Sequence, residues 1–322
     1  MSPEQIRKLR HLLKAKKIGL LVLRLLIGAL FITTAVFKLL AIEEFELYIY
    51  SFGIFNFLLS TIVARLVIMA EMLFGICLMA KLMYKYVWRL TMLMLVGFTL
   101  LLIYVAIFRN DTNCHCFGEI VPLAPVKSII KNVVTMLLLL LIRKEKDYRF
   151  RGKVVVIVFA FLVSIIVPFV VFPMDAVINK LFAPDGDIIN VEAFTMFQED
   201  STMTDFDIHD GNYVIAVYSS GCKYCKMSAK ITSMMMEQNG IDSTRFQIFI
   251  YGDTAQIQEF LEETNTQKYT WHHIIDPYMA LALGNGSFPV YYVTADGKVI
   301  KGLDYRGMNE SALREYLSDY KQ

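Results

Sequence analysis

The sequence predicts a multi-domain protein, in which an all-α membrane helical bundle is followed by an α/β domain. Hydrophobic residues make up 56% of its 322 residues, which is too many for an ordinary soluble chain, and most of the excess lies before Pro173. After Pro173, short apolar runs of strand length alternate with helical patterns. The formal net charge of +2 is close to neutral, so we expect no nucleic-acid partner.

The membrane domain is predicted from apolar segments, because a transmembrane helix needs about 20 predominantly apolar residues. Five segments qualify, at about 18–41, 55–80, 87–108, 126–142 and 154–172, of which the fourth is short. The first follows a basic stretch like that of a signal peptide, but its apolar run is too long and no cleavage site follows, so we expect a retained span. We therefore assign residues 1–150 to a four-span core, 151–190 to a fifth span and linker, and 191–322 to the α/β domain.

The orientation follows from the distribution of Lys and Arg in the short loops. The N-terminal stretch, the loop with Lys81 and the segment after the fourth span are basic, whereas the loops with Glu43 and Cys114 carry few basic residues. With five spans, this alternation places the N-terminus in the cytoplasm and puts the Cys114 loop and the α/β domain outside. We expect a multi-pass protein of the bacterial inner membrane, surrounded by lipid, with its α/β domain in the periplasm, where disulfides persist.

Three residues within the predicted spans are unusual for a membrane helix. Lys38 lies near the outer end of the first span, where its long side chain either snorkels to the interface or pairs with Glu71 of the second span. Cys77 has no other cysteine near it in the sequence, and we expect it to pack as a small hydrophobic side chain.

Four of the five cysteines form two close pairs, and the first pair lies in the membrane half. Cys114 and Cys116 flank His115 in a polar loop between the third and fourth spans. A disulfide across one intervening residue closes a small, strained ring and is labile, so we interpret this pair as a redox relay. The alternative is a metal site with three ligands, but adjacent ligands rarely all reach one ion, and we predict no metal site.

The loop reads Cys114-His-Cys-Phe-Gly-Glu and is followed by Pro122 and by Lys131-Asn132 in the next span. Together with Lys38, Glu71 and Gly75 in the first two spans, this pattern resembles the MauE/DoxX redox-associated membrane proteins over residues 18–142. The resemblance implies a four-helix membrane core that is linked to disulfide formation in exported proteins. It leaves the electron acceptor open, and a quinone or another membrane redox partner is the candidate.

The α/β domain shows a regular order of elements from about residue 190. We predict strands at 213–218, 246–251 and 288–294, and the last of these continues through the Asp296-Gly297 turn into a hairpin. We predict helices at about 222–238, 254–264 and 309–320.

The second cysteine pair, Cys222-Lys-Tyr-Cys225, lies at the start of the first of these helices. Unpaired backbone N–H groups and the helix dipole there favour the Cys222 thiolate, and Lys223 adds a positive charge. Cys225 lies one turn deeper, from where it can reach back to resolve a mixed disulfide.

Ser-Gly-Cys222-x-x-Cys225, Pro289 at the start of a late strand and the Asp296-Gly297 turn resemble the thioredoxin-like family, in particular its membrane-tethered TlpA/ResA branch, over residues 190–322. The resemblance implies that Pro289 is the family's cis-proline beside the cysteines, whereas the alternative is an ordinary strand-opening proline. Two positions depart from the family: Gly221 replaces a common Trp, and Ala216 replaces a buried acid. Without that acid, proton transfer to Cys225 needs another group or water, which leaves the direction of net electron flow open.

The predicted fold is thus a membrane helical bundle, with a four-helix core and a fifth span, followed by an α/β thioredoxin-like domain. The predicted function is that of a membrane-anchored thiol–disulfide oxidoreductase acting on exported proteins that contain cysteine. Electrons are expected to pass between the two pairs without a cofactor in the α/β domain, through catalytic residues Cys222, Cys225, Cys114, Cys116 and Pro289. Two alternatives stay open: an assembly factor that holds a client through mixed disulfides without turnover, and a metallochaperone using Cys114, His115 and Cys116.

Overall fold

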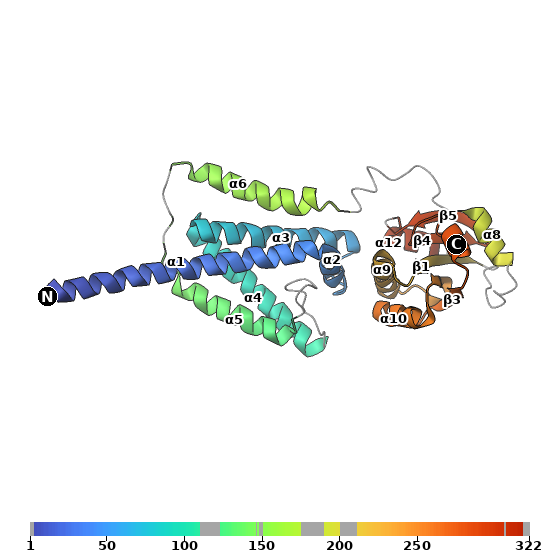
Figure 1. Cartoon of the computed structure of the whole chain (residues 1–322), viewed down its shortest axis with the longest axis horizontal. Coiled ribbons are helices and arrows are strands. Elements are labelled where there is room, and N and C mark those ends of the chain that lie inside the picture. The colour runs from blue at the N-terminus through green and yellow to red at the C-terminus, as the bar shows by residue number, and fades with distance from the viewer. Residues whose placement is uncertain are drawn as a thin grey trace. The chain divides into compact units, whose positions relative to one another are not determined.

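The computed structural model describes residues 3–109, 123–145, 147, 151–174, 190–199, 211–305 and 307–317. They form two compact units, a helical unit that ends at Pro173 and an α/β unit built mainly from the residues after it (Figure 1). Each unit has its own hydrophobic core. The predicted fold class, a helical membrane bundle followed by an α/β domain, is confirmed.

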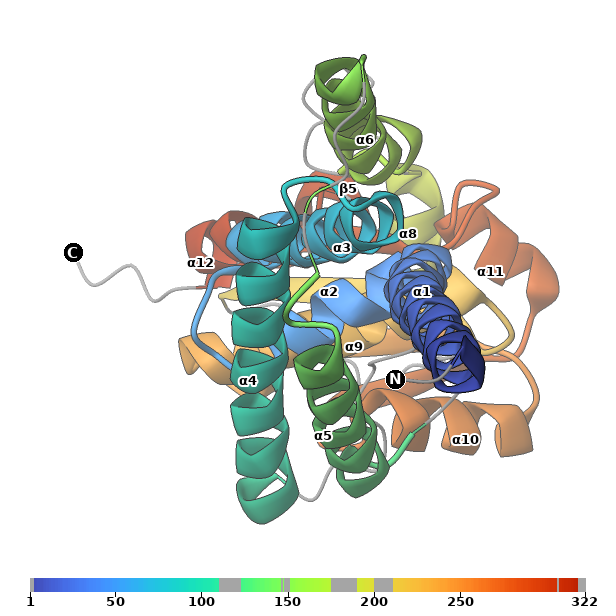
Figure 2. The same cartoon turned by 90° about the vertical axis from the view of Figure 1, so that its left-hand side faces the viewer.

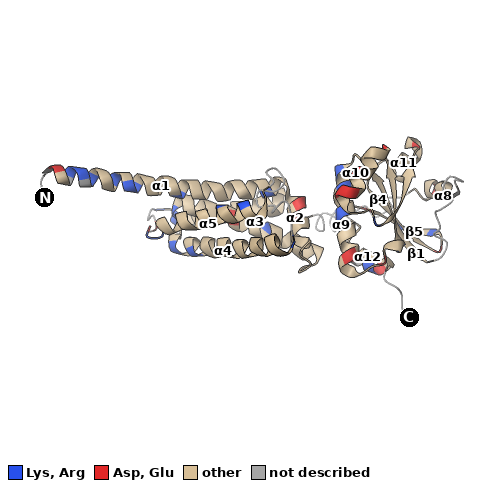
Figure 3. Cartoon of the chain, turned by 90° about the horizontal axis from the view of Figure 1, so that it is seen from below, with Lys and Arg blue, Asp and Glu red and all other residues tan. Residues whose placement is uncertain are grey.

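The helical unit consists of α1 (Pro3–Leu40), α2 (Ile42–Tyr50), α3 (Phe57–Ala80), α4 (Tyr84–Phe108), α5 (Pro125–Leu141) and α6 (Lys153–Ile166), which continues as a π-helical turn, η1 (Val167–Val171). Among the described residues, four segments are long and apolar enough to cross a membrane: Arg10–Leu40, Phe57–Ala80, Tyr84–Phe108 and Lys153–Val171. Lys and Arg residues are frequent in the N-terminal part of α1, ahead of its apolar run (Figure 3).

The predicted span at 126–142 forms helix α5, which has 17 residues. At 1.5 Å per residue, α5 is about 26 Å long, slightly less than a hydrocarbon core of about 30 Å. It packs along α4, which lies beside it in both views (Figures 1 and 2). Helix α2 was not predicted and occupies what the sequence indicated as a loop.

Helices α1 and α3 approach each other closely at two glycines. A Cβ atom built on Gly28 would lie 2.9 Å from the carbonyl oxygen of Gly75, and one on Gly75 would lie 2.9 Å from that of Gly28. Both distances are shorter than a real Cβ contact, so neither position has room for a side chain. Small residues that let helix backbones touch are a common basis of packing between membrane helices.

The buried charged residues described in the helical unit are paired. Lys38 and Glu71 form a buried ion pair between α1 and α3. Of the two alternatives for Lys38, the structure therefore shows pairing with Glu71 rather than snorkelling to the interface. Lys38 Nζ also lies 5.4 Å from the centroid of the Phe45 ring and 5.6 Å from that of the Phe98 ring. Two further charged residues, Arg24 and Arg65, also lie within the predicted spans, and their partners were not predicted from the sequence. Arg24 Nη1 contacts Glu145 Oε2 at 3.0 Å, and Arg65 pairs with Glu46 of α2, so every charge named here has a partner of opposite sign.

The α/β unit contains strands β1 (Asn212–Ser219), β2 (Phe246–Tyr251), β3 (Thr270–Ile274), β4 (Val290–Ala295) and β5 (Lys298–Asp304), in the order β3-β2-β1-β4-β5. β1 is parallel to β2, and β2 is parallel to β3, whereas β4 is antiparallel to both β1 and β5. The helices are α8 (Val191–Glu199), α9 (Lys223–Asn239), α10 (Thr254–Thr264), α11 (Pro277–Leu283) and α12 (Glu310–Leu317). This arrangement is consistent with the predicted thioredoxin-like fold.

Helices cover both faces of the sheet. α9 packs against α10 and α12 on one face, and α8 packs with α11 on the other, where Phe194 stacks on Tyr292 at 4.7 Å between ring centroids. The predicted hairpin is confirmed: Asp296 and Gly297 have φ values of 47° and 78°, as a turn of type I′ requires. Elements α8, β3 and α11 were not predicted.

Candidate functional site

The site begins where β1 ends and α9 starts. Cys222 is the N-cap of α9, with extended backbone, and its Sγ accepts a hydrogen bond from the Cys225 backbone N–H at 3.2 Å. An N-cap side chain normally satisfies one of the free N–H groups of the first turn. Here a sulfur atom takes that role, so the start of the helix stabilises negative charge on Cys222.

The two cysteines differ sharply in accessibility. Cys222 is half-buried, whereas Cys225 is fully buried and its Sγ accepts a hydrogen bond from the Ser219 N–H at 3.5 Å. Two neighbours of Cys222 in the sequence, Gly221 and Tyr224, are exposed, so the surface around the outer thiol is accessible. Of the two thiols, only that of Cys222 reaches this surface.

The acidities of the two thiols diverge in the same way. A hydrogen bond from the Cys225 thiol, helped by the backbone N–H groups of Cys225 and Tyr224, lowers the pKa of Cys222 to about 6. Burial raises the pKa of Cys225 far above the usual range for a thiol, and its hydrogen bond to Cys222 adds to this shift. The sequence attributed part of the thiolate stability to Lys223, but the pKa shift comes from hydrogen bonds.

This difference predicts how Cys222 reacts with an alkylating reagent. In the reduced protein, the alkylation rate at Cys222 is expected to rise with pH around an inflection near 6, well below the value of about 8.5 for a free thiol. In a Cys225→Ala variant the inflection should move upward, because the strongest hydrogen bond to the thiolate is lost. Peptide mass mapping assigns the modified residue, and an inflection at or above 8.5 in the unmodified protein would contradict the geometry.

Pro289 lies beside the outer thiol. The Phe288–Pro289 peptide bond is cis, and Cys222 Sγ lies 3.9 Å from the Phe288 carbonyl oxygen. The structure therefore brings Cys222, Cys225 and Pro289 together at one end of the central strands. Tyr224 packs against Tyr305 at 5.6 Å between ring centroids, next to the same thiol pair in the sequence.

A buried cluster of hydroxyl groups behind the cysteines was not anticipated. Tyr291 OH lies 3.0 Å from Tyr218 OH and 3.1 Å from Thr232 Oγ1, and it also bonds to Ser228 Oγ. Ser228 and Thr232 follow Cys225 on the same face of α9, at spacings of three and seven residues. Burial raises the pKa of both tyrosines, and a negative charge on Cys225 would raise them further.

Ala216 occupies the position at which the sequence departs from the buried acid of thioredoxin-like proteins. It lies directly opposite Tyr291 in the antiparallel pairing of β1 and β4. Neutral hydroxyls thus occupy the space behind Cys225. Because the raised pKa values keep both tyrosines protonated at neutral pH, these groups act as hydrogen-bond partners rather than as bases.

The cluster makes Tyr291 important for stability. A Tyr291→Phe variant is expected to unfold more easily by about 1–3 kcal/mol, because three buried hydroxyls lose a shared partner. Chemical denaturation of the protein, followed by the circular dichroism of its α/β unit, measures the change. Tyr278→Phe is the control, because Tyr278 is 81% exposed and its loss of a hydroxyl should cost nothing. Equal stability of both variants would show that the cluster contributes no net energy.

The sequence also singles out Cys114, His115 and Cys116, and these residues lie outside the described part of the chain. Cys77 is buried in the core of the helical unit, among side chains that include Ile27 and Leu78, as a small hydrophobic residue would be. Within the described part of the chain, no three His, Cys, Asp or Glu side chains come together as metal ligands.

Comparison with known proteins agrees with this description. Residues 16–143 match the family described as methylamine utilisation protein MauE. Protein TlpB from Flavobacterium psychrophilum is 26% identical over 321 residues, covering 84% of this chain and 87% of that relative. No solved structure matches the chain.

The match at residues 16–143 confirms the resemblance of the membrane half to MauE. The apolar helices confirm that this half is a membrane domain. The strand order of the α/β unit is consistent with the predicted thioredoxin-like fold. Both comparisons support a redox-related role at a membrane. The chain is a multi-pass membrane protein that combines a domain similar to MauE with a C-terminal domain of thioredoxin-like fold.

Proposed function

We propose that the protein is a membrane-anchored thiol–disulfide oxidoreductase for exported proteins. The observation that carries this proposal is the pairing of a half-exposed thiol of pKa about 6, Cys222, with a fully buried thiol, Cys225, in one helical turn. At pH 7 a thiol of that pKa is about 90% thiolate, compared with about 3% for a free cysteine. Cys222 is therefore the nucleophile and the site of attack by clients.

The exchange proceeds in two steps. The Cys222 thiolate attacks one sulfur of a client disulfide, the client S–S bond breaks, and a client thiolate leaves while a mixed disulfide forms. Cys225 then loses its proton, attacks the Cys222 sulfur, and expels the second client thiolate. Two electrons pass to the client, and a Cys222–Cys225 disulfide is formed. The reverse sequence oxidises a client dithiol. The redox partner of the Cys222–Cys225 pair sets the direction of net electron flow.

The second thiol pair supplies that partner in our proposal. Cys114 and Cys116 would exchange electrons with the Cys222–Cys225 pair, since a linker of fewer than 20 residues, at about 174–190, keeps the effective concentration in the millimolar range. This exchange requires both pairs on the same side of the membrane. It therefore requires α5 to cross the bilayer, with the N-terminus in the cytoplasm and the α/β domain in the periplasm.

A quinone is the candidate electron acceptor in the bacterial inner membrane. The surroundings of Glu71 suit one: Glu71 Oε2 is buried without a hydrogen-bond partner among the described residues, and the Phe45 and Phe98 rings lie around the neighbouring Lys38. Glu71 Oε2 would accept a hydrogen bond from a quinol hydroxyl, and the phenylalanine rings would pack against the quinol ring. When bound, a quinone would take up two electrons and two protons.

Turnover tests the proposal. The purified full-length protein is mixed with an excess of a peptide dithiol, or of a peptide disulfide, together with a redox partner. Conversion of many equivalents of peptide per protein supports an oxidoreductase. Formation of at most one equivalent of mixed disulfide supports the holding function instead. Conversion that is unaffected by Cys222→Ser would refute the assignment of the site.

A further inference from the structure

A second candidate site lies in the helical unit, away from the thiols. A pocket of about 510 Å³ opens where α4 begins and α5 ends, lined by Met83, Lys85, Tyr86, Trp88, Arg89, Arg143, Glu145 and Asp147. These two helices pack side by side, and α4 is one of the segments that can cross a membrane (Figure 2). The pocket therefore lies at the end of the apolar segments, at the depth of lipid headgroups.

The pocket carries positive charge that nothing described in the chain neutralises. Lys85, Arg89 and Arg143 are exposed, and none forms an ion pair with a described carboxylate. The two acids that line the pocket are already occupied by cations that do not line it. Lys81 Nζ and Arg24 Nη1 contact Glu145 Oε2 at 2.7 and 3.0 Å, and Lys153 Nζ contacts Asp147 Oδ2 at 2.8 Å.

The Trp88 side chain of the pocket is held in place. The Trp88 Nε1–H donates to the Leu139 carbonyl oxygen at 2.9 Å, which fixes the indole between the two helices. The Arg143 guanidinium lies over that ring, 5.7 Å from its centroid. Exposed Tyr86 lies on the same turn of α4. Trp and Tyr gather where a protein meets the headgroup region, because their rings are apolar on one side and polar on the other.

Apolar surface continues from the pocket along the helices. Leu93 follows Arg89 by one turn on α4 and is 69% exposed, and Leu141, two residues before Arg143 on α5, is 65% exposed. A ligand with an anionic head and apolar tails would therefore match both the pocket and the surface below it. A free phosphate ion would match only the pocket.

We propose that this pocket binds the phosphate group of an anionic glycerophospholipid, with Lys85, Arg89 and Arg143 as the phosphate-binding side chains. Basic pockets between transmembrane helices on the cytoplasmic side are suited to such headgroups. Trp88 positions Arg143 through the stacking described above. Bound in this way, a lipid joins the ends of α4 and α5 and so stabilises the short helix α5.

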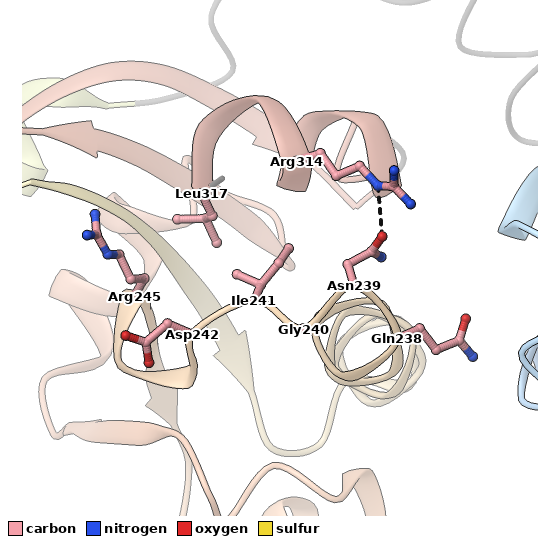
Figure 4. A pocket seen from close by; sticks show the side chains of 8 residues that line it. All are labelled: Gln238, Asn239, Gly240, Ile241, Asp242, Arg245, Arg314 and Leu317. Atoms are coloured by element: carbon pink, nitrogen blue, oxygen red, sulfur yellow. Dashed lines mark hydrogen bonds between the residues drawn. The ribbon is translucent and has the colours of Figure 1, made fainter. Parts of the chain in front are cut away.

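A pocket of similar size in the α/β unit lacks these features. Its volume is about 450 Å³, and its cations are Arg245 and Arg314 (Figure 4). Arg314 Nε donates to Asn239 Oδ1 at 2.7 Å and Nη2 pairs with Glu310 at 2.9 Å, and Asp242 also lines the pocket. No aromatic ring is among its lining residues, and acidic side chains lie beside both of its cations, so it does not offer a comparable anion site.

The test uses the fluorescence of Trp88. The chain has two tryptophans, so Trp271→Phe leaves Trp88 as the reporter in the otherwise complete protein. The protein in a neutral detergent is titrated with short-chain phosphatidylglycerol, with short-chain phosphatidylcholine, and with inorganic phosphate. Saturable binding of phosphatidylglycerol, with no comparable response to the other two, is expected. An equal response to phosphatidylcholine would overturn the proposal, and an equal affinity for inorganic phosphate would replace the lipid by a free anion.

Matched variants locate the binding. Lys85→Gln/Arg89→Gln/Arg143→Gln is expected to weaken binding by about 100-fold, from about 1 kcal/mol for each basic side chain. Lys14→Gln/Lys16→Gln/Lys17→Gln removes the same charge from the exposed start of α1 and should leave binding unchanged. Equal weakening in both triple variants would show general attraction and overturn the site. If the first triple variant does not fold, Arg89→Gln alone, at an exposed position, decides the same question through a smaller loss of affinity.

Discussion

A Cys222→Ser variant is expected to lose disulfide exchange entirely, down to the uncatalysed rate. The serine hydroxyl is protonated at neutral pH and cannot form a disulfide, whereas the thiol it replaces has a pKa of about 6 and is mostly thiolate. The fully buried Cys225 cannot substitute for it, because it cannot reach a client and its burial disfavours the thiolate. Oxidation of a peptide dithiol by the full-length protein measures the loss.

Cys225→Ser serves as the comparison for that experiment. It leaves the nucleophile in place but removes the thiol that resolves the mixed disulfide, so turnover should stop while the protein accumulates client linked to Cys222. Non-reducing electrophoresis separates the two phenotypes. Equal accumulation of mixed disulfides in both variants would contradict the division of roles between an outer and an inner thiol.

Replacing Glu71 by alanine is expected to destabilise the helical unit by about 3–5 kcal/mol, which is the cost of leaving one member of a buried ion pair alone. Lys38 is 4% exposed and lies near two phenylalanine rings. Glu71 is the one described carboxylate that its ammonium group contacts, so the variant leaves a buried positive charge without a partner. The two aromatic rings soften the loss without replacing the lost charge. Unfolding in mixed micelles of increasing denaturing detergent measures the difference.

The double variant Lys38→Met/Glu71→Leu is the matched control. It removes both charges and keeps similar volumes, so most of the lost stability should return, as it does when buried pairs are replaced by apolar residues. Together with the single variants Lys38→Met and Glu71→Leu, it completes a cycle that isolates the interaction between the two side chains. If the double variant is as unstable as Glu71→Ala, the pair is not what holds α1 and α3 together at this point.

The sequence predicts best where a local pattern alone decides the structure. Strand β2 and helix α10 begin and end where predicted. β2 is a short run that is apolar except for Gln247, and α10 is capped by Asp253 and Asn265 at its two ends. The position of Cys222 at the N-terminus of α9, as its N-cap, follows from the same kind of local signal.

Prediction fails where an element is short or polar. Strand β3 is an edge strand that contains His272 and His273 and is only partly buried, so it shows neither alternation nor a continuous apolar run. Helix α11 has 7 residues, and helix α2 has 9 and lies in a stretch rich in Glu. In each case the contacts made after folding, rather than local preference, decide the structure.

The candidate site shows the same limit. The roles of Cys222, Cys225 and Pro289 could be proposed from their spacing, but the hydroxyl cluster could not. It exists because the register of β1 and β4 sets Ala216 opposite Tyr291, which no local signal specifies. Arg24 and Glu145 are 121 residues apart in the sequence, so their pairing likewise depends on how the helices pack.

The central claim is that the two thiol pairs exchange electrons, and a trapped disulfide between them tests it most directly. Two variants are needed, Cys116→Ser/Cys225→Ser and Cys114→Ser/Cys225→Ser, each with a protease site inserted in the linker after Met174. After cleavage, the halves should stay joined through Cys222 on a non-reducing gel in at least one variant.

The control moves the thiol of the α/β unit to the far end of β4 from Pro289, by combining Cys222→Ser and Cys225→Ser with Lys298→Cys at an exposed position of the hairpin. Tethering alone would join this thiol to the membrane cysteines equally well. We predict that Cys222 links to Cys114 or Cys116 well above this control. Linking no greater than the control in both variants would contradict the relay.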